Sequence, residues 1–114
     1  MPHCIIEYSS NLSPALSLEQ LVESVHLGAL QSELFELDDI KTRATSYEHF
    51  KLGGDTEHFI HVTVRLLSGR TQQQKNRLSQ LVLKQLADLE LLSISLSVEV
   101  CDINRETYAK QVLT

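Results

Sequence analysis

Residues 58–71 read HFIHVTVRLLSGRT, and this stretch decides the fold. Its first part, 58–67, is rich in β-branched residues and gives the strongest strand signal in the chain. Gly69 marks a turn, and Thr71 is a residue type that often caps the N-terminus of a helix. Leu78, Leu81, Val82, Gln85 and Leu89 then recur at helical spacing. The stretch therefore predicts a strand, a turn and a helix over 72–89.

The same order of elements precedes this stretch. Residues 2–8 predict a strand, and residues 9–14 have the composition of a turn. Ser17, with Gln20 three positions later, predicts a capping box at the start of a helix that runs to about Gln31. After a connection over 33–39, residues 40–47 predict another strand, in which Lys41, Arg43 and Thr45 share a face.

A last strand is predicted over 93–100, where Ile94, Leu96, Val98 and Val100 alternate with polar residues. A short helix is expected after it, with Asp102 or Asn104 as its cap. The chain thus has two β-α-β units and no linker, so we expect one α+β domain over 1–114. A two-layer fold with a four-stranded sheet and both helices on one face fits this order. We expect the opposite face, taken to be rich in Ile, Leu and Val, to be covered by other copies of the chain.

Composition excludes several classes of function. The net charge of −5 argues against a nucleic-acid or anionic-membrane partner, since both favour basic surfaces. An anionic substrate would need a local group of Arg or Lys. The chain shows no signal-peptide pattern and no apolar run of bilayer length, so we expect a soluble, cytoplasmic protein with no membrane partner.

The sequence predicts neither a metal nor a cofactor. Cys4 and Cys101 lack metal-like spacing and are expected to be buried and reduced. His58 and His61 are three positions apart on a strand, so they point to opposite faces, which disfavours binding of one metal by both. Phosphate-loop, dinucleotide and esterase motifs are also missing.

The dipeptide Met1-Pro2 is the most informative candidate for chemistry. Initiator methionine is usually removed before proline, which would leave a secondary amine at the start of a strand. An unperturbed α-amino group has a pKa of roughly 7.7–8.0. Burial and nearby cations lower this pKa, and an amine that titrates near the working pH is a good general base.

Four segments carry a resemblance to a known family. They are PHCIIEYSSN (residues 2–11), KTRA (41–44), FIHVT (59–63) and LSGR (67–70). In order and spacing they resemble the 5-carboxymethyl-2-hydroxymuconate isomerases of the tautomerase superfamily, over essentially the whole chain. The resemblance implies a tautomerase-like fold with a mixed sheet, assembled as a homotrimer with active sites near subunit boundaries.

The resemblance also implies an activity and roles for residues. Its members isomerise unsaturated polycarboxylates during the breakdown of homoprotocatechuate-type aromatic compounds, without a cofactor. Pro2 is expected to carry a proton between atoms of the dienol, and Arg70 to bind a carboxylate and stabilise the enolate. Arg43 and Lys41 are expected to bind substrate: the guanidinium of Arg43 can hold a carboxylate with two parallel hydrogen bonds, and Lys41 on the same face supplies a cation without that geometry. Related sequences tend to have Arg at the position of Lys41, so substrate preference or rate can differ here.

Two alternatives remain open at the level of sequence. One is a tautomerase that acts on another enol, such as a phenylpyruvate-like enol. The other is a trimeric binding or structural protein with the same fold and no activity. Retention of Met1 would favour this last alternative, because the proposed base would then be an amide nitrogen.

Overall fold

The computed structural model describes residues 1–12, 14 and 16–114. The stretch with the strongest strand signal forms strand β3 (His58–Leu67), with the bounds that the sequence predicted. The other elements, in chain order, are β1 (His3–Ser9), α1 (Leu18–Gln31), the short 3₁₀ helix η1 (Leu37–Asp39), β2 (Lys41–Tyr47), α2 (Gln72–Ala87), β4 (Ile94–Ile103) and the 3₁₀ helix η2 (Arg105–Thr107). The α+β class and the tandem β-α-β order are confirmed. The turn predicted over 9–14 includes Ser13, which lies outside the described residues.

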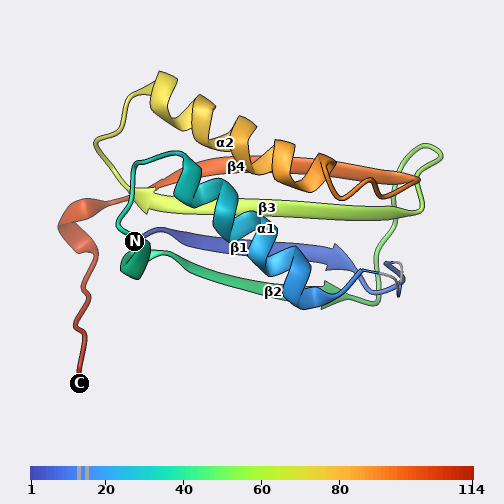
Figure 1. Ribbon diagram of the computed structural model, residues 1–114, viewed down its shortest axis with the longest axis horizontal. Helices are drawn as coiled ribbons and strands as arrows, with labels where there is room; N and C mark the ends of the chain where they lie inside the picture. Colours follow the sequence, from blue (N-terminus) through green and yellow to red (C-terminus); the bar gives the residue numbers. More distant parts are fainter. Residues whose placement is uncertain (13, 15) are drawn as a thin grey trace.

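The sheet is mixed, with strand order β2-β1-β3-β4. Strand β1 runs parallel to β2 and antiparallel to β3, and β3 runs parallel to β4. Both helices cover the same face, with α2 over β3 and β4 and α1 over β1 and β2 (Figure 1). The predicted four-stranded mixed sheet with two helices on one face is therefore confirmed.

Side-chain caps begin both long helices where the sequence placed them. Ser17 Oγ accepts a hydrogen bond from the backbone N–H of Gln20 at 3.0 Å. Thr71 Oγ1 accepts from the N–H of Gln74 at 3.1 Å, and the Gln74 side chain accepts from the N–H of Thr71 at 2.9 Å. The reciprocal pair at Thr71 is a full capping box, which satisfies N–H groups that the helix itself cannot pair.

Two element ends differ from the prediction. Helix α2 ends at Ala87, before the expected 89, because Glu90 adopts a φ of 56° and turns the chain out of the helix. Strand β4 runs beyond the expected 100 to Ile103, because it continues in register with β3 as far as the Leu67 and Ile103 pair. The turn at Glu90 thus sets the end of α2, and pairing with β3 sets the end of β4. The hydrophobic period of the sequence determines neither boundary.

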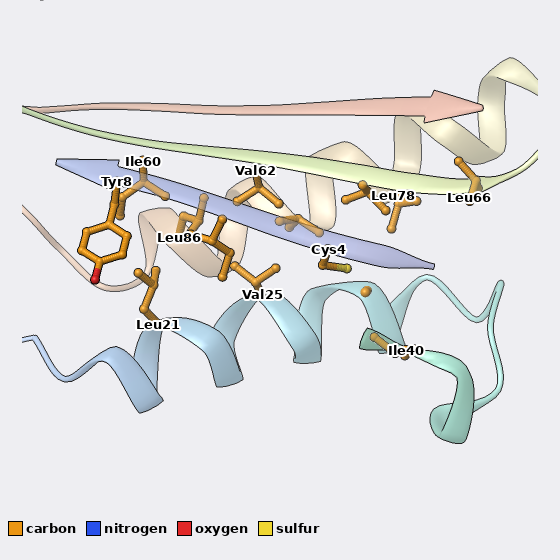
Figure 2. Packing of buried hydrophobic residues seen from close by; sticks show 14 residues of the cluster. Cys4, Tyr8, Leu21, Val25, Ile40, Ile60, Val62, Leu66, Leu78 and Leu86 are labelled. Carbon is orange, nitrogen blue, oxygen red and sulfur yellow. The ribbon is translucent and has the colours of Figure 1, made fainter. Parts of the chain in front are cut away.

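The core lies between the helices and the sheet. It is formed by apolar side chains from every long element except β2 and β4, whose apolar residues pack around it. Figure 2 shows Leu21 and Val25 of α1 facing Cys4 and Val62 of the sheet. Burial raises the pKa of the Cys4 thiol to about 11, so this cysteine is an inert core residue, whereas Cys101 is only half-buried.

The uncovered face of the sheet is largely polar. Strand alternation sends the buried residues Cys4, Ile6 and Val62 to the covered face. The opposite face carries His3, Ile5, Glu7, Lys41, Arg43, Thr45, Tyr47, Phe59, His61, Thr63, Arg65, Leu67, Ser95, Ser97, Glu99, Cys101 and Ile103. The expectation of an uncovered face rich in Ile, Leu and Val is therefore wrong, because the helices already cover the apolar residues.

Candidate active site

A cavity lies at the end of the sheet where β1 and β2 begin and β3 and β4 end. The N-terminus, the connection between α1 and β2, and the segment after β4 all come to this end (Figure 1). The cavity has a volume of about 310 Å³ and is lined by Met1, Glu33, Leu34, Phe35, Glu36, Asp39, Leu67, Arg70 and Arg105. Its size lies at the lower end of the range for small-molecule sites.

Met1 lies in the wall of this cavity and Pro2 is buried directly behind it. The Met1 amine donates a hydrogen bond to the backbone oxygen of Asp39 at 2.9 Å, and Pro2 O accepts one from the N–H of Lys41 at 3.0 Å. Burial lowers the pKa of the Met1 amine, and Lys110 and Lys41 lower it further against the opposing effect of Asp39. An amine at this end of β1 is therefore biased towards its basic form.

Arg70 follows the turn at the end of β3 and lines the same cavity as Met1. Its Nη2 donates a hydrogen bond to the backbone oxygen of Leu34 at 2.8 Å, and its guanidinium lies 5.8 Å from the centre of the Phe35 ring. These contacts hold the side chain over the connection that precedes β2. Two of the sequence-predicted positions, the N-terminus and Arg70, thus come together.

Arg105 also lines the cavity, and nothing in the sequence singled it out. Its Nε and Nη2 both donate to the backbone oxygen of Ser68, at 3.2 and 2.9 Å. The predicted short helix with Asn104 as its cap is present as η2, and Asn104 Oδ1 accepts from the N–H of Glu106 at 3.0 Å. The predicted cap was the only feature of the sequence that pointed to this segment. It predicted a helical turn but not the direction of the Arg105 side chain.

Lys41 and Arg43 line a different hollow, next to α1, together with Val22, Glu23, His26, Ile40 and Thr42. Arg43 Nη1 lies 3.1 Å from Nδ1 of His3. Since a guanidinium only donates, Nδ1 is the acceptor, and Nε2 of His3 then donates to the Tyr108 hydroxyl at 2.9 Å. Burial, followed by the charges of Arg43 and Lys41, lowers the pKa of His3 and keeps it neutral.

Acidic side chains complete the cavity wall. Asp39 is paired with Lys110, whose Nζ lies 3.0 Å from Asp39 Oδ1, and this contact lowers the pKa of the Asp39 carboxyl. Glu33 and Glu36 line the wall as well. The cavity wall therefore carries both signs of charge, with Glu33 and Glu36 next in the chain to the residues that Arg70 contacts, and an anion would bind where the guanidinium groups are nearest.

The described residues provide neither a metal site nor a membrane-spanning helix. Within residues 1–12, 14 and 16–114, no three His, Cys, Asp or Glu side chains are grouped so as to hold a metal ion. None of the helices in the described part of the chain has the length and apolar character needed to cross a bilayer.

The sequence model of one protein family, 5-carboxymethyl-2-hydroxymuconate isomerase, matches residues 2–112. The chain belongs to this family. The resemblance noted in the sequence is thereby confirmed, and the 5-carboxymethyl-2-hydroxymuconate isomerase family places the chain among tautomerase-type isomerases. A comparison with curated proteins gave no match.

Solved structures share the fold of this family member over almost its full length. A 5-carboxymethyl-2-hydroxymuconate isomerase from Deinococcus radiodurans R1 has a TM-score of 0.81 at 22% identity, over 96% of this chain and 88% of that one. A 5-carboxymethyl-2-hydroxymuconate delta-isomerase has a TM-score of 0.80 at 18% identity, over 98% and 88%. A fused 4-OT protein described as a symmetric trimer has a TM-score of 0.75 at 20% identity, over 90% and 86%.

Proposed function

We propose that the chain isomerises an unsaturated 2-hydroxy or 2-oxo polycarboxylate, such as 5-carboxymethyl-2-hydroxymuconate, with the amine of Pro2 as general base. The observation that carries this proposal is that Met1 and Arg70 line one cavity in a member of the isomerase family. Removal of Met1 would leave the amine of Pro2 beside that cavity and would enlarge it.

In this mechanism the Pro2 amine takes a proton from one oxygen or carbon of the dienol and returns it to another carbon. The reaction needs no oxidant or reductant, because proton transfer conserves electrons and only relocates a double bond. Arg70 binds a carboxylate and stabilises the negative charge that develops on the enolate. Lys41 and Arg43 line their own hollow, so we propose that they bind a remote carboxylate of the substrate or face another subunit.

We propose that the active molecule is a homotrimer. Support comes from the family resemblance, from the sheet face that no helix covers, and from the similar fold of a protein described as a symmetric trimer. Because the uncovered face is polar, its contacts between subunits would be hydrogen bonds and ion pairs more than apolar packing.

The test combines intact mass with an activity assay. Mass spectrometry first measures whether Met1 is absent from the purified chain. Ultraviolet absorbance then follows the isomerisation of 2-hydroxydienes with two or three carboxylates. A processed, trimeric chain without activity on any of these substrates would contradict the proposal and favour a non-catalytic binding protein.

A phenylpyruvate-like enol is the second candidate substrate. Phe35 and Leu67 line the cavity and offer apolar surface that could contact an aryl ring. Such a substrate carries one carboxylate and would need only Arg70. A higher kcat/KM for the phenylpyruvate enol than for the polycarboxylate dienols would favour this candidate.

A further inference from the structure

Two arginines from distant parts of the chain meet at one cavity. Arg70 comes just after β3, and Arg105 comes just after β4. The two strands are parallel and in register up to the pair Leu67 and Ile103, so the residues that follow them leave the sheet side by side. Both side chains line the cavity that also contains Met1.

Backbone oxygens hold both guanidinium groups. Arg105 donates twice to Ser68 O, and Arg70 donates to Leu34 O. None of the ion pairs among the described residues includes either arginine. A neutral carbonyl fixes the orientation of a guanidinium without cancelling its charge. In Arg105 the Nη1 group is left over after these bonds and is available to an anion.

Gly69 forms the turn between β3 and Arg70, and Arg105 packs against this turn. The φ of Gly69 is 124°, a conformation that residues with a side chain rarely adopt. A Cβ at this position would lie 3.7 Å from Nη2 of Arg105, so the Arg105 side chain packs directly against the turn that precedes Arg70. The Arg105 side chain therefore lies beside the turn that precedes Arg70, and both arginines line the one cavity.

We propose that Arg105 binds a second carboxylate of the substrate, so that this cavity selects dicarboxylates over monocarboxylates. The inference rests on the proposed function in one respect, that Arg70 binds the first carboxylate. Glu33, Glu36 and Asp39 also line this cavity, but no ion pair among the described residues joins them to either arginine. An anion with two carboxylates can therefore pair with both guanidinium groups, whereas a monocarboxylate pairs with one. Arg105 is thus a specificity-determining residue.

Binding of matched probes tests the proposal without relying on turnover. Muconate and sorbate share a planar diene and differ in having two carboxylates or one, and neither is an enol. Calorimetry on the full, processed chain should show tighter binding of muconate than of sorbate. Arg105→Ala should weaken muconate binding by about 10–100-fold, the effect of losing a charge-assisted contact, and should leave sorbate binding unchanged.

Further variants separate substrate binding from bracing of the turn. Arg105→Gln keeps an N–H donor for Ser68 but loses the charge, so it should behave as Arg105→Ala does and covers the case in which that variant fails to fold. Arg77→Ala is the matched control, because Arg77 also donates to a backbone oxygen, that of Ser32 at 2.9 Å, and does not line the cavity. It should leave both affinities unchanged.

Three outcomes would overturn the proposal. They are equal loss of muconate and sorbate binding in Arg105→Gln, unchanged muconate binding in that variant, and equal affinity of the unaltered chain for the two probes. Failure of the proposed function is a separate result. If the chain prefers muconate through Arg105 but isomerises no dienol, the role of Arg105 stands and the proposed role of Pro2 is contradicted.

Discussion

Nη2 of Arg70 lies 2.8 Å from the backbone oxygen of Leu34, so the residue that leaves β3 is tied to the connection that leads into β2. The two β-α-β units are thereby joined at the end of the sheet where the cavity lies. Arg70 consequently has a structural contact in addition to its proposed contact with substrate. The activity of an Arg70 variant therefore has to be compared with that of a variant that loses only a structural contact.

Arg70→Ala should lower kcat/KM by about 10–150-fold, because it removes a charge-assisted hydrogen bond to a carboxylate. Arg70→Lys should recover part of the loss, since the charge returns without the two-pronged geometry. Steady-state kinetics measure both, with circular dichroism as a check of folding. Arg77→Ala is again the control and should keep full activity. If Arg70→Ala also keeps full activity, Arg43 and Lys41 become the leading candidates for carboxylate binding.

Pro2→Ala should lower the rate by about 10²–10⁴-fold, the usual contribution of a general base. Alanine still permits removal of Met1 but replaces a secondary amine by a primary amine of different basicity and geometry. Intact mass has to show that both proteins lack Met1 before their kinetics are compared. Full activity of the processed variant on its natural substrate would rule out Pro2 as the base.

The pH profile should report a base whose pKa is lower than that of an ordinary α-amino group. Burial, Lys110 and Lys41 lower the pKa of the Met1 amine against Asp39, and the Pro2 amine lies one residue deeper in the same surroundings. Because the proposed base acts in its unprotonated form, kcat/KM should rise with pH and level off, with a midpoint below that of an ordinary α-amino group. Lys110→Gln removes a cation and frees the Asp39 carboxylate, so it should move the midpoint to higher pH. A midpoint that stays in place in this variant would contradict the electrostatic explanation.

Gly28→Ala should destabilise the fold by about 1–3 kcal/mol, the usual cost of overpacking. A Cβ on Gly28 of α1 would lie 2.9 Å from the Cα of Val82 and 3.2 Å from the backbone oxygen of Leu81, both on α2. The helices would have to separate. Gly53→Ala is the matched control, because its Cβ would have no neighbour within 4 Å. Urea unfolding at one protein concentration measures both, and equal midpoints would show that the close contact of α1 and α2 at Gly28 does not contribute to stability.

Light scattering at micromolar concentration should give a mass close to three times the chain mass of 12.9 kDa. A polar sheet face predicts that the assembly is weakened by salt more than an apolar interface would be. The same measurement in high salt tests this point. A monomer mass in dilute buffer would contradict the trimer.

The sequence was sufficient to predict the elements of the fold. Strand periodicity identified β3, and the caps Ser17 and Thr71 marked where both helices begin. These signals are local, since a cap or an alternating pattern depends on residues within one turn or one strand. The Met1-Pro2 start and Arg70 could also be selected from sequence, because they lie in segments that resemble a known family.

Only the tertiary structure decided which charges share a cavity and which face of the sheet is left uncovered. Lys41 and Arg43 follow each other on one face of β2, yet they line a separate hollow, while Arg105 meets Arg70 although the whole of α2 and β4 lies between them. The physical reason is that strand pairing sets these neighbours. Parallel β3 and β4 end together in register, and no local pattern in the sequence specifies which strand ends will meet.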